Sequence, residues 1–193
     1  AFYFDIRKDT LYCDSPASIE RRACRTVMDQ VLQCLISWIA PILCFTADEA
    51  WMAYRGDEND SIHLHEYAAT DPAWQNAELG EKWAAIRMLR SQITTALEAA
   101  RNDGLIGGSL SADIRVETAA ETAVLLEGLD LASLCITSSA VLIKGEGETK
   151  IEVRRADGGK CARCWKQFPE ISKDSDSDIC TRCQTVVAEQ GAA

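Results

Sequence analysis

The chain has 193 residues, of which 47% are hydrophobic and 26% are charged, an ordinary globular composition that excludes disorder and a collagen-like fibre. The formal net charge of −10 argues, for the chain as a whole, against non-specific adhesion to nucleic acid. The longest apolar stretch, residues 31–45, contains Gln33, Ser37 and Pro41, so it falls short of the roughly 20 uninterrupted apolar residues that a membrane span needs. We therefore expect a soluble protein that has no membrane partner.

Nine cysteines do not indicate a disulfide framework here. Their number is odd, the chain is long enough to build its own core, and no export signal opens the sequence. Reduced thiols in a cytoplasmic protein fit these facts better. Ala1 stands where an initiator methionine would stand, so we expect a fragment of a longer protein.

The first hundred residues are predicted to form helices after an irregular start. Residues 2–14 mix aromatic and charged side chains without a period of 2 or 3.6, so we expect irregular chain there, with a short strand at 10–13. Ser15 and Pro16 predict the N-cap and the first position of a helix. Its apolar stripe runs to about Ala40.

Two further helices are expected. Pro41 should end or kink the first helix, and residues 46–49, Thr-Ala-Asp-Glu, match a capping box that would open the second. A third helix is predicted over 79–101, where apolar residues recur at helical spacing before Asn-Asp-Gly at 102–104 stops it. These helices predict a bundle.

After Gly107 and Gly108 the pattern changes, because residues 110–117 alternate between apolar and polar as a half-buried strand does. A short helix at about 119–129 and strands near 134–137, 141–144 and 150–155 would complete a small α/β layer, and residues 157–159 are predicted to be a linker. We expect a mainly α protein with an α+β part. Its three modules are a helical domain at 1–102, a small α/β junction domain at 103–157 and a final module at 158–193.

The final module carries the strongest chemical signal. The pattern C-x2-C recurs after 15 intervening residues, and its cysteines are Cys161, Cys164, Cys180 and Cys183. Two such pairs can turn four thiolates toward one ion and form the closed tetrahedral shell that zinc adopts in structural sites. We therefore predict a zinc ribbon with one structural zinc ion, in which metal binding and folding are one event. A redox dithiol is the alternative, but such a pair opens a helix after a strand and usually occurs once.

The remaining cysteines and the two histidines suggest no catalytic site. We expect the other five thiols to be inert packing groups; they belong to Cys13, Cys24, Cys34, Cys44 and Cys135. His63 and His65 would face opposite ways in a strand or loop and are expected to be ordinary surface residues. Since the sequence has no nucleophile motif and no phosphate-binding loop, a binding module is the most economical interpretation.

Charge is distributed unevenly along the chain. Residues 46–85 carry nine acidic and two basic side chains, whereas residues 144–166 carry seven basic and four acidic ones. Cations and rings in and around the predicted ribbon could reach phosphates and stack on unpaired bases; they are Arg154, Arg155, Lys160, Arg163, Trp165, Lys166 and Phe168. Alternatively, Trp165 and Phe168 form the small core of the ribbon and the cations are a solvated face. The residues alone leave both interpretations open.

Several segments, taken in order, resemble the C-terminal part of bacterial isoleucyl-tRNA synthetases. They are FYFDIRKDTLYCD, FTADEAW, SIHLHEY, ALEAAR followed by IGGSL, KCARCW and ICTRC. FTADEAW is shared with the related valine and leucine enzymes, whereas IRKDTLYCD together with KCARCW is specific to the isoleucine enzymes. The resemblance extends over nearly the whole chain, from about residue 2 to residue 183.

The resemblance implies that residues 1–102 belong to the helical anticodon-binding domain of a class I ligase, followed by a junction and a zinc ribbon. The parent enzyme activates isoleucine with ATP, joins it to tRNA(Ile) and hydrolyses mischarged valine in an editing domain. The HIGH and KMSKS signatures of ATP binding are absent from this sequence. By this resemblance, the chain would recognise the anticodon stem-loop of tRNA(Ile) without catalysis of its own, as part of a monomeric cytoplasmic enzyme whose catalytic and editing domains lie elsewhere in the parent chain.

The resemblance also implies site residues. The zinc ligands carry over to Cys161, Cys164, Cys180 and Cys183, and the expected tRNA contacts are Arg7, Lys8, Arg163, Trp165 and Lys166. Gly104 and Ser111 depart from the family, in which many members have a lysine before the IG-x-SL turn and an acidic residue after it. We therefore expect no charge pair at this turn, and we expect the acidic segment 46–85 to face away from RNA.

Two other classes of function have to be weighed. DNA-repair glycosylases carry a terminal finger with similar cysteine spacing, but they need an N-terminal proline nucleophile and a β-rich first domain, whereas this chain begins Ala-Phe and is predicted to start with helices. A protein-interaction zinc ribbon on a helical scaffold is the other alternative. Binding to a partner other than RNA, with an affinity that does not depend on salt, would indicate the interaction ribbon, because the affinity for RNA falls as the salt concentration rises.

Overall fold

The computed structural model describes residues 2–171 and 177–191. Contacts divide the chain into two compact units, one made of Ala1–Ser15 with Ala77–Ala193 and the other of Pro16–Asn76. The predicted division into three modules, with boundaries after residues 102 and 157, stays a prediction, because compactness alone does not show which segments fold independently.

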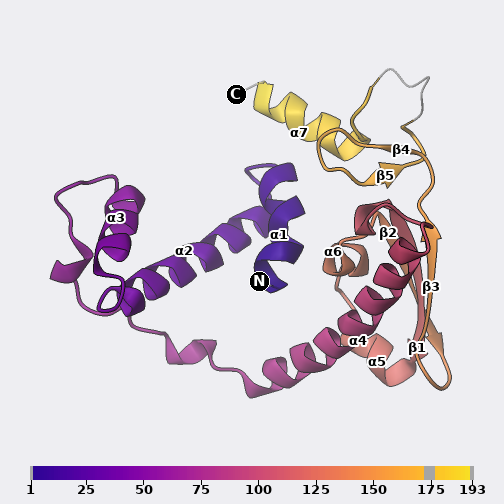
Figure 1. Ribbon diagram of the computed structural model, residues 1–193, viewed down its shortest axis with the longest axis horizontal. Helices are drawn as coiled ribbons and strands as arrows, with labels where there is room; N and C mark the ends of the chain where they lie inside the picture. Colours follow the sequence, from indigo (N-terminus) through magenta and orange to yellow (C-terminus); the bar gives the residue numbers. More distant parts are fainter. Residues whose placement is uncertain (1, 172–176, 192–193) are drawn as a thin grey trace. The chain divides into compact units, whose positions relative to one another are not determined.

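The first unit contains a three-stranded sheet in the order β2-β1-β3 (Figure 1). β1 (Ala112–Ala119) pairs in parallel with β2 (Ser139–Gly145) and antiparallel with β3 (Lys150–Arg155). The side chains of Ala112, Ile114 and Val116 are fully buried and alternate with more exposed neighbours, as the sequence pattern predicts. The strands expected at 110–117, 141–144 and 150–155 are thus confirmed, and each observed end lies within two residues of the predicted one.

Three helices pack on the buried face of this sheet (Figure 1): α4 (Ala77–Asn102), α5 (Ala120–Leu125) and α6 (Leu131–Cys135). α4 confirms the third predicted helix, and its apolar stripe of Ile86, Leu89, Ile93, Leu97 and Ala100 is buried in the shared core. α5 and α6 form the connection between the parallel strands β1 and β2, which cannot be joined by a tight turn.

The strand predicted at 134–137 is wrong, because Leu134 and Cys135 lie in α6. The N-cap of α6 is Asp130, whose carboxylate accepts hydrogen bonds from the backbone N–H of Ser133 at 3.2 Å and from its hydroxyl at 2.6 Å. Ile136 follows with φ of 58° and ends the helix in the left-handed region. A short apolar run does not distinguish a strand from a buried helical turn.

The start of the chain is helical rather than irregular, so the prediction for residues 2–14, including a strand at 10–13, is wrong. α1 (Phe2–Cys13) belongs to the first unit. Ile6 is buried in the core beneath the sheet, and Cys13 is buried in a separate cluster with the four cysteines of the ribbon. The packing of Ile6 and Cys13 therefore stabilises α1 as a helix, although its sequence shows no helical period.

The first unit ends in β4 (Gly159–Lys160), β5 (Gln167–Phe168) and α7 (Thr181–Gly191). Of the linker predicted at 157–159, residues 157 and 158 are irregular chain between β3 and β4, whereas Gly159 pairs with Phe168 and its N–H donates to the carbonyl of Ile171 at 2.6 Å. Gly158 has φ of +87°, and a Cβ there would lie 1.9 Å from the carbonyl oxygen of Phe168. Two backbones approach each other here at a distance that only glycine permits.

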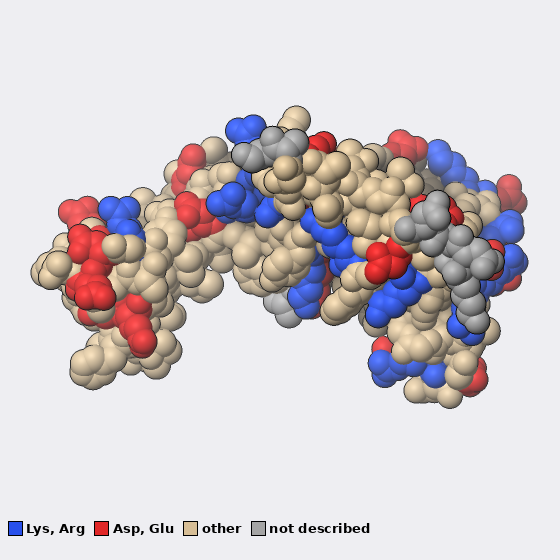
Figure 2. Space-filling model, turned by 90° about the horizontal axis from the view of Figure 1, so that it is seen from above, with Lys and Arg blue, Asp and Glu red and all other residues tan. Residues whose placement is uncertain are grey.

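The second unit consists of α2 (Ile19–Ile39), α3 (Cys44–Arg55), and the 3-10 turns η1 (Ile62–Leu64) and η2 (Pro72–Trp74). Its small core contains Ile36, Ala40, Ala47, Trp51 and Ile62. On the face shown in Figure 2, acidic side chains gather over the end of this unit that contains α3. Within the described residues, no helix is long and apolar enough to cross a membrane.

Two predicted helix starts in the second unit are wrong. The N-cap of α2 is Ser18, whose hydroxyl accepts from the N–H of Arg21 at 3.1 Å, whereas Ser15 and Pro16 precede the helix in a turn. Thr46 does not cap α3, because this helix already begins at Cys44. Ser15 and Ser18 are both cap-like residues within one turn of each other, whereas the N-cap of α3 is Leu43, which forms no side-chain cap hydrogen bond.

Candidate metal centre and nucleic-acid interface

Four buried thiols converge at the end of the first unit. The sulfur atoms of Cys161, Cys164, Cys180 and Cys183 all lie within 4.8 Å of one another, and those of Cys164 and Cys180 are 3.9 Å apart. A tetrahedron with Zn–S bonds of about 2.3 Å has edges of about 3.8 Å. The spacing therefore fits a zinc ion held by four thiolates.

Local backbone structure brings the two cysteine pairs together. The first pair lies in the turn between β4 and β5, where the N–H of Cys161 donates to the carbonyl of Lys166 and the N–H of Trp165 donates to that of Cys161, both at 2.9 Å. Trp165 closes this turn with φ of 66°. Of the second pair, Cys180 immediately precedes α7 and Cys183 lies in its first turn.

The electrostatics of the cluster favour a bound cation. Burial disfavours the thiolate of Cys161, but the backbone N–H groups of Cys164, Cys180 and Arg163 outweigh it and lower the pKa of Cys161 to about 6. Burial raises the pKa of Cys164 and that of Cys180. Further deprotonation needs a nearby positive charge, which a bound dication supplies. A closed shell of four thiolates suits a structural zinc and has no open position for a reacting water.

The cations of both cysteine pairs hold the C-terminal half of α1. Nη1 of Arg163 donates to the carbonyl of Cys13 at 2.6 Å, and its Nη2 donates to that of Tyr12 at 3.1 Å. Arg182 forms two hydrogen bonds with Asp9, at 2.7 and 2.9 Å. These contacts fasten α1 to the ribbon, and the two arginines that occupy equivalent slots in the cysteine pairs have parallel roles.

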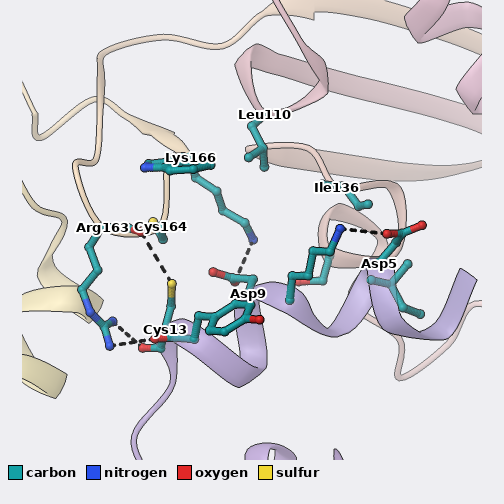
Figure 3. A pocket seen from close by; sticks show the side chains of 13 residues that line it. Asp5, Asp9, Cys13, Leu110, Ile136, Arg163, Cys164 and Lys166 are labelled. Atoms are coloured by element: carbon teal, nitrogen blue, oxygen red, sulfur yellow. Dashed lines mark hydrogen bonds and ion pairs between the residues drawn. The ribbon is translucent and has the colours of Figure 1, made fainter. Parts of the chain in front are cut away.

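Beside the thiol cluster lies a pocket of about 450 Å³, shown in Figure 3. α1 forms one wall through residues that include Ile6, Asp9 and Tyr12, and the first cysteine turn forms the opposite wall. Leu110 and Ile136 add apolar surface. Lys166 extends across the pocket toward Asp9, with 3.6 Å between its Nζ and the carboxylate.

Four of the five residues predicted to contact tRNA line this pocket: Lys8, Arg163, Trp165 and Lys166. Trp165 is 58% exposed, and the ammonium of Lys160 lies 5.0 Å from the centre of its ring. The alternative that Trp165 fills the small core of the ribbon does not fit this exposure. Lys166 is mostly buried, its side chain being 12% exposed.

The fifth predicted residue lies elsewhere. Arg7 is half-buried, and its guanidinium is 5.8 Å from the ring of Tyr3. It is not among the residues that line the pocket. Lys8 is well exposed and donates to Asp5 at 2.9 Å. The two neighbouring basic residues therefore lie in different surroundings, Arg7 beside Tyr3 and Lys8 at the pocket.

The sequence does not predict the pairing of Asp9 with Arg182 or the packing partners of Cys13. Asp9 and Arg182 were not singled out for pairing, because no spacing rule relates positions so distant in the chain. Cys13 was expected to be a packing group and is indeed buried, and its packing partners are the four cysteines. Burial raises the pKa of Cys13 to about 11, and the charge of Asp9 acts in the same direction.

The two histidines lie in the second unit, where η1 replaces the predicted strand or loop. His65 pairs with Asp60, and its ring centre is 4.9 Å from that of Trp51. Nε2 of His63 lies 3.2 Å from the carbonyl oxygen of Cys44. Both histidines are exposed, as expected of surface residues, and their imidazoles contact other residues of the second unit.

Comparison with known proteins identifies two family matches. Residues 1–117 match the family described as the anticodon-binding domain of tRNA ligase, and residues 158–186 match the zinc finger found in FPG and IleRS. The second match and the four-cysteine cluster together support one structural zinc ion.

Curated relatives named isoleucine–tRNA ligase match almost the whole chain. The protein of Gluconobacter oxydans is 47% identical over 192 residues, that of Zymomonas mobilis 42% over 194 and that of Agrobacterium fabrum 38% over 205. These alignments cover 97%, 98% and 100% of this chain, but only 20%, 20% and 21% of the relatives. The chain thus spans about a fifth of their length. Because the first family match covers more than half of the residues, the chain belongs to the family of anticodon-binding domains of tRNA ligases.

Proposed function

We propose that this chain is the tRNA-binding C-terminal part of an isoleucine–tRNA ligase and that it recognises the anticodon stem-loop of tRNA(Ile). The whole enzyme would join isoleucine to its tRNA at the expense of ATP, with catalytic and editing domains outside this sequence. The names and the alignments of the relatives support this proposal. The proposal includes a cytoplasmic, monomeric parent enzyme.

The zinc site is part of the proposal. Cys161, Cys164, Cys180 and Cys183 would be the ligands of one zinc ion, whose role is to fix the shape of the ribbon. The metal supplies a charge that binds four thiolates, and the backbone N–H of Cys180, 3.3 Å from the sulfur of Cys161, helps to orient one of them. No step of the ligation reaction is assigned to this site.

The observation that carries the proposed RNA contact is the grouping of predicted contact residues at one pocket beside the thiol cluster. Trp165 offers an exposed ring on which an unpaired base can stack, a contact worth about 1–3 kcal/mol per base. Lys160, above that ring, and Lys8, at the pocket, can meet phosphates. Arg163 and Lys166 bind α1, so we propose that they contribute mainly by shaping the pocket and by their positive charge.

A fluorescence-anisotropy titration tests the proposal. The zinc-loaded chain is titrated with tRNA(Ile) and with the same tRNA carrying a changed anticodon, at two salt concentrations. We expect tighter binding to the unchanged anticodon, and weaker binding to both RNAs at higher salt because counterions are released on association. Equal affinity for both RNAs, or binding insensitive to salt, would contradict the proposal.

A pair of tryptophan variants connects the result to the site. Trp165→Ala should weaken binding of tRNA(Ile) by about 5- to 150-fold, the equivalent of one lost stacking contact. Trp74 lies in the second unit and is 51% exposed, so Trp74→Ala removes a comparably exposed ring that does not line the pocket. An equal effect of both substitutions would contradict the assignment of the contact to Trp165.

A further inference from the structure

A second candidate site lies on α4, away from the zinc ribbon. Residues 82–97 contain Lys82, Arg87 and Arg90 but no acidic residue, in a chain whose net charge is −10. Arg87, Arg90, Ser91 and Thr94 line a pocket of about 240 Å³ together with Phe2 of α1. Their spacing of three, four and seven positions places these four side chains along one side of the helix.

The two guanidinium groups are held near one aromatic ring. The Cζ atom of Arg90 lies 5.0 Å from the centre of the Phe2 ring, and that of Arg87 lies 5.7 Å from it. Trp83 packs edge-on against Phe2, with 6.2 Å between the ring centres. Contact with an aromatic ring attracts guanidinium groups without using their N–H donors, so these donors stay available to a ligand.

The remaining contacts of the arginines leave room for an anion. Nε of Arg90 donates to the carbonyl of Leu134 at 2.8 Å, which fixes its orientation and leaves its two terminal nitrogens. Within the described parts of the chain, neither arginine forms an ion pair. The hydrogen bond from Lys8 lowers the pKa of Asp5, and the charge of Arg90 adds a smaller effect in the same direction, so this carboxylate already has Lys8 as its partner.

Two hydroxyl groups complete the lining. Ser91 and Thr94 are exposed on the same side of α4, and the hydroxyl of Thr94 donates to the carbonyl of Arg90 at 2.9 Å. Planar guanidinium groups bind phosphate oxygens with two parallel hydrogen bonds. Two such groups, with a serine hydroxyl one turn away, are donors suited to a tetrahedral oxyanion.

We propose that Arg87, Arg90 and Ser91 form a phosphate-binding site on α4 that takes a backbone phosphodiester of the bound RNA. This inference rests on the proposed tRNA-binding function and adds a contact that depends on the backbone rather than on the bases. Such contacts fix the position of a protein on nucleic acid without reading its sequence. The site would therefore strengthen the binding of tRNA(Ile) and of its anticodon variant equally.

The test compares arginine variants of the zinc-loaded chain in the same anisotropy titration. Arg87→Gln should weaken the binding of both RNAs about 3- to 10-fold and lower the slope of log K against log salt by roughly 0.7–1. Arg101→Gln is the matched control, because Arg101 is also an exposed arginine of α4 but pairs with Glu98 at 2.5 Å. Equal effects of Arg87→Gln and Arg101→Gln would overturn the site.

A direct measurement separates this inference from the proposed function. Inorganic phosphate is titrated into the chain while the side-chain N–H signals of its arginines are followed by NMR. We expect saturable shifts of the Arg87 and Arg90 signals, with Arg101 unchanged and the Arg90 shift reduced in Arg87→Gln. If the anticodon is discriminated but these shifts are absent, the phosphate site is wrong and the proposed function stands. If the shifts are present and no RNA binds, the anion site exists but its assignment to RNA is wrong.

Discussion

Arg182 and Asp9, which are 173 positions apart in the sequence, form a two-pronged ion pair with N–O distances of 2.7 and 2.9 Å. The same guanidinium also donates to Asp14 at 3.1 Å, and Lys166 approaches Asp9 at 3.6 Å. Asp9 thus receives one cation from each cysteine pair of the ribbon. Its hydrogen bond with Asp9 raises the pKa of Arg182, although burial acts against this, so the guanidinium stays charged. These ion pairs join α1, at the start of the chain, to the ribbon at its end.

Substitution of Asp9 by Asn should destabilise the first unit by about 1–3 kcal/mol, because the mostly buried Lys166 and the partly exposed Arg182 both lose a counter-charge. Urea unfolding of the zinc-loaded chain measures this change. Asp5→Asn is the matched control on the same helix, since the one ion pair that Asp5 forms among the described residues is with the exposed Lys8, and it should leave the unfolding midpoint nearly unchanged. Equal midpoints for the two variants would contradict the proposed role of Asp9.

Removal of one thiol should unfold the ribbon without unfolding the rest. Cys161→Ser should abolish stoichiometric zinc binding and expose the amides of β4, β5 and α7 to hydrogen exchange, because this small segment has few buried side chains apart from its cysteines. The helical circular dichroism from the rest of the chain should persist. Cys44→Ser, at an exposed thiol of the second unit, should retain the zinc. Loss of most of the helical signal in Cys161→Ser would show that the ribbon is not a separate folding unit.

Gly158 should tolerate no side chain. Gly158→Ala combines a left-handed backbone, φ of +87°, with a Cβ placed 1.9 Å from the carbonyl oxygen of Phe168, so β4 and β5 would have to separate. Gly147 has a similar φ of +90° but open space around its Cα, and Gly147→Ala should cost only about 1–2 kcal/mol of backbone strain. We expect Gly158→Ala to cost at least about 2 kcal/mol more in thermal or urea unfolding. Equal costs would mean that the close approach relaxes easily.

The N-cap of α6 gives a pH-dependent prediction. Burial acts to raise the pKa of Asp130, but hydrogen bonds from the hydroxyl and N–H of Ser133 outweigh it and lower that pKa. The charge of Asp130 therefore stabilises the fold above its unfolded pKa of about 3.9, and this contribution is lost as the pH falls through the lower folded value. Asp130→Ala should cost about 1 kcal/mol at pH 7.

Asp130→Asn is the reference for that titration, because its side chain keeps an oxygen acceptor but carries no charge. The stability difference between the natural chain and this variant should shrink as the pH falls from 5 to 3. Release of zinc at low pH affects both proteins alike and cancels in the difference. A difference that does not change over this range would show that the charge of Asp130 contributes nothing to the fold.

The sequence predicts the elements whose patterns are set by local burial. The stripe that includes Ile86 and Ile93, and the alternation around Ile114, each have one face in the core, so the helix and the strand were recognisable. α1 was not, because it is stabilised by partners more than 70 positions away, such as the core beneath the sheet and Arg182. Leu134 and Cys135 are buried in either conformation, so their hydrophobicity did not reveal a helix.

In the candidate site, too, the features that depend on local sequence were predictable and those that depend on distant partners were not. The spacing of Cys161, Cys164, Cys180 and Cys183 identified a cluster that the structure places within 4.8 Å, because each pair is a local turn. The environments of Arg163 and Lys166 were not predictable, since a basic residue beside a cysteine has the same sequence signature whether it faces RNA or α1. The structure distinguishes the exposed Trp165 from the mostly buried Lys166.

Photo-cross-linking can show whether the pocket beside the zinc ribbon receives the anticodon loop, as we propose. An anticodon stem-loop of tRNA(Ile) with 4-thiouridine placed in the loop is irradiated in complex with the zinc-loaded chain, and the modified peptides are mapped by mass spectrometry. We predict cross-links within residues 160–168, at or next to Trp165, that Trp165→Ala abolishes. Cross-links confined to residues 16–76, or their absence from the ribbon under saturating binding, would show that the anticodon loop does not bind at this pocket.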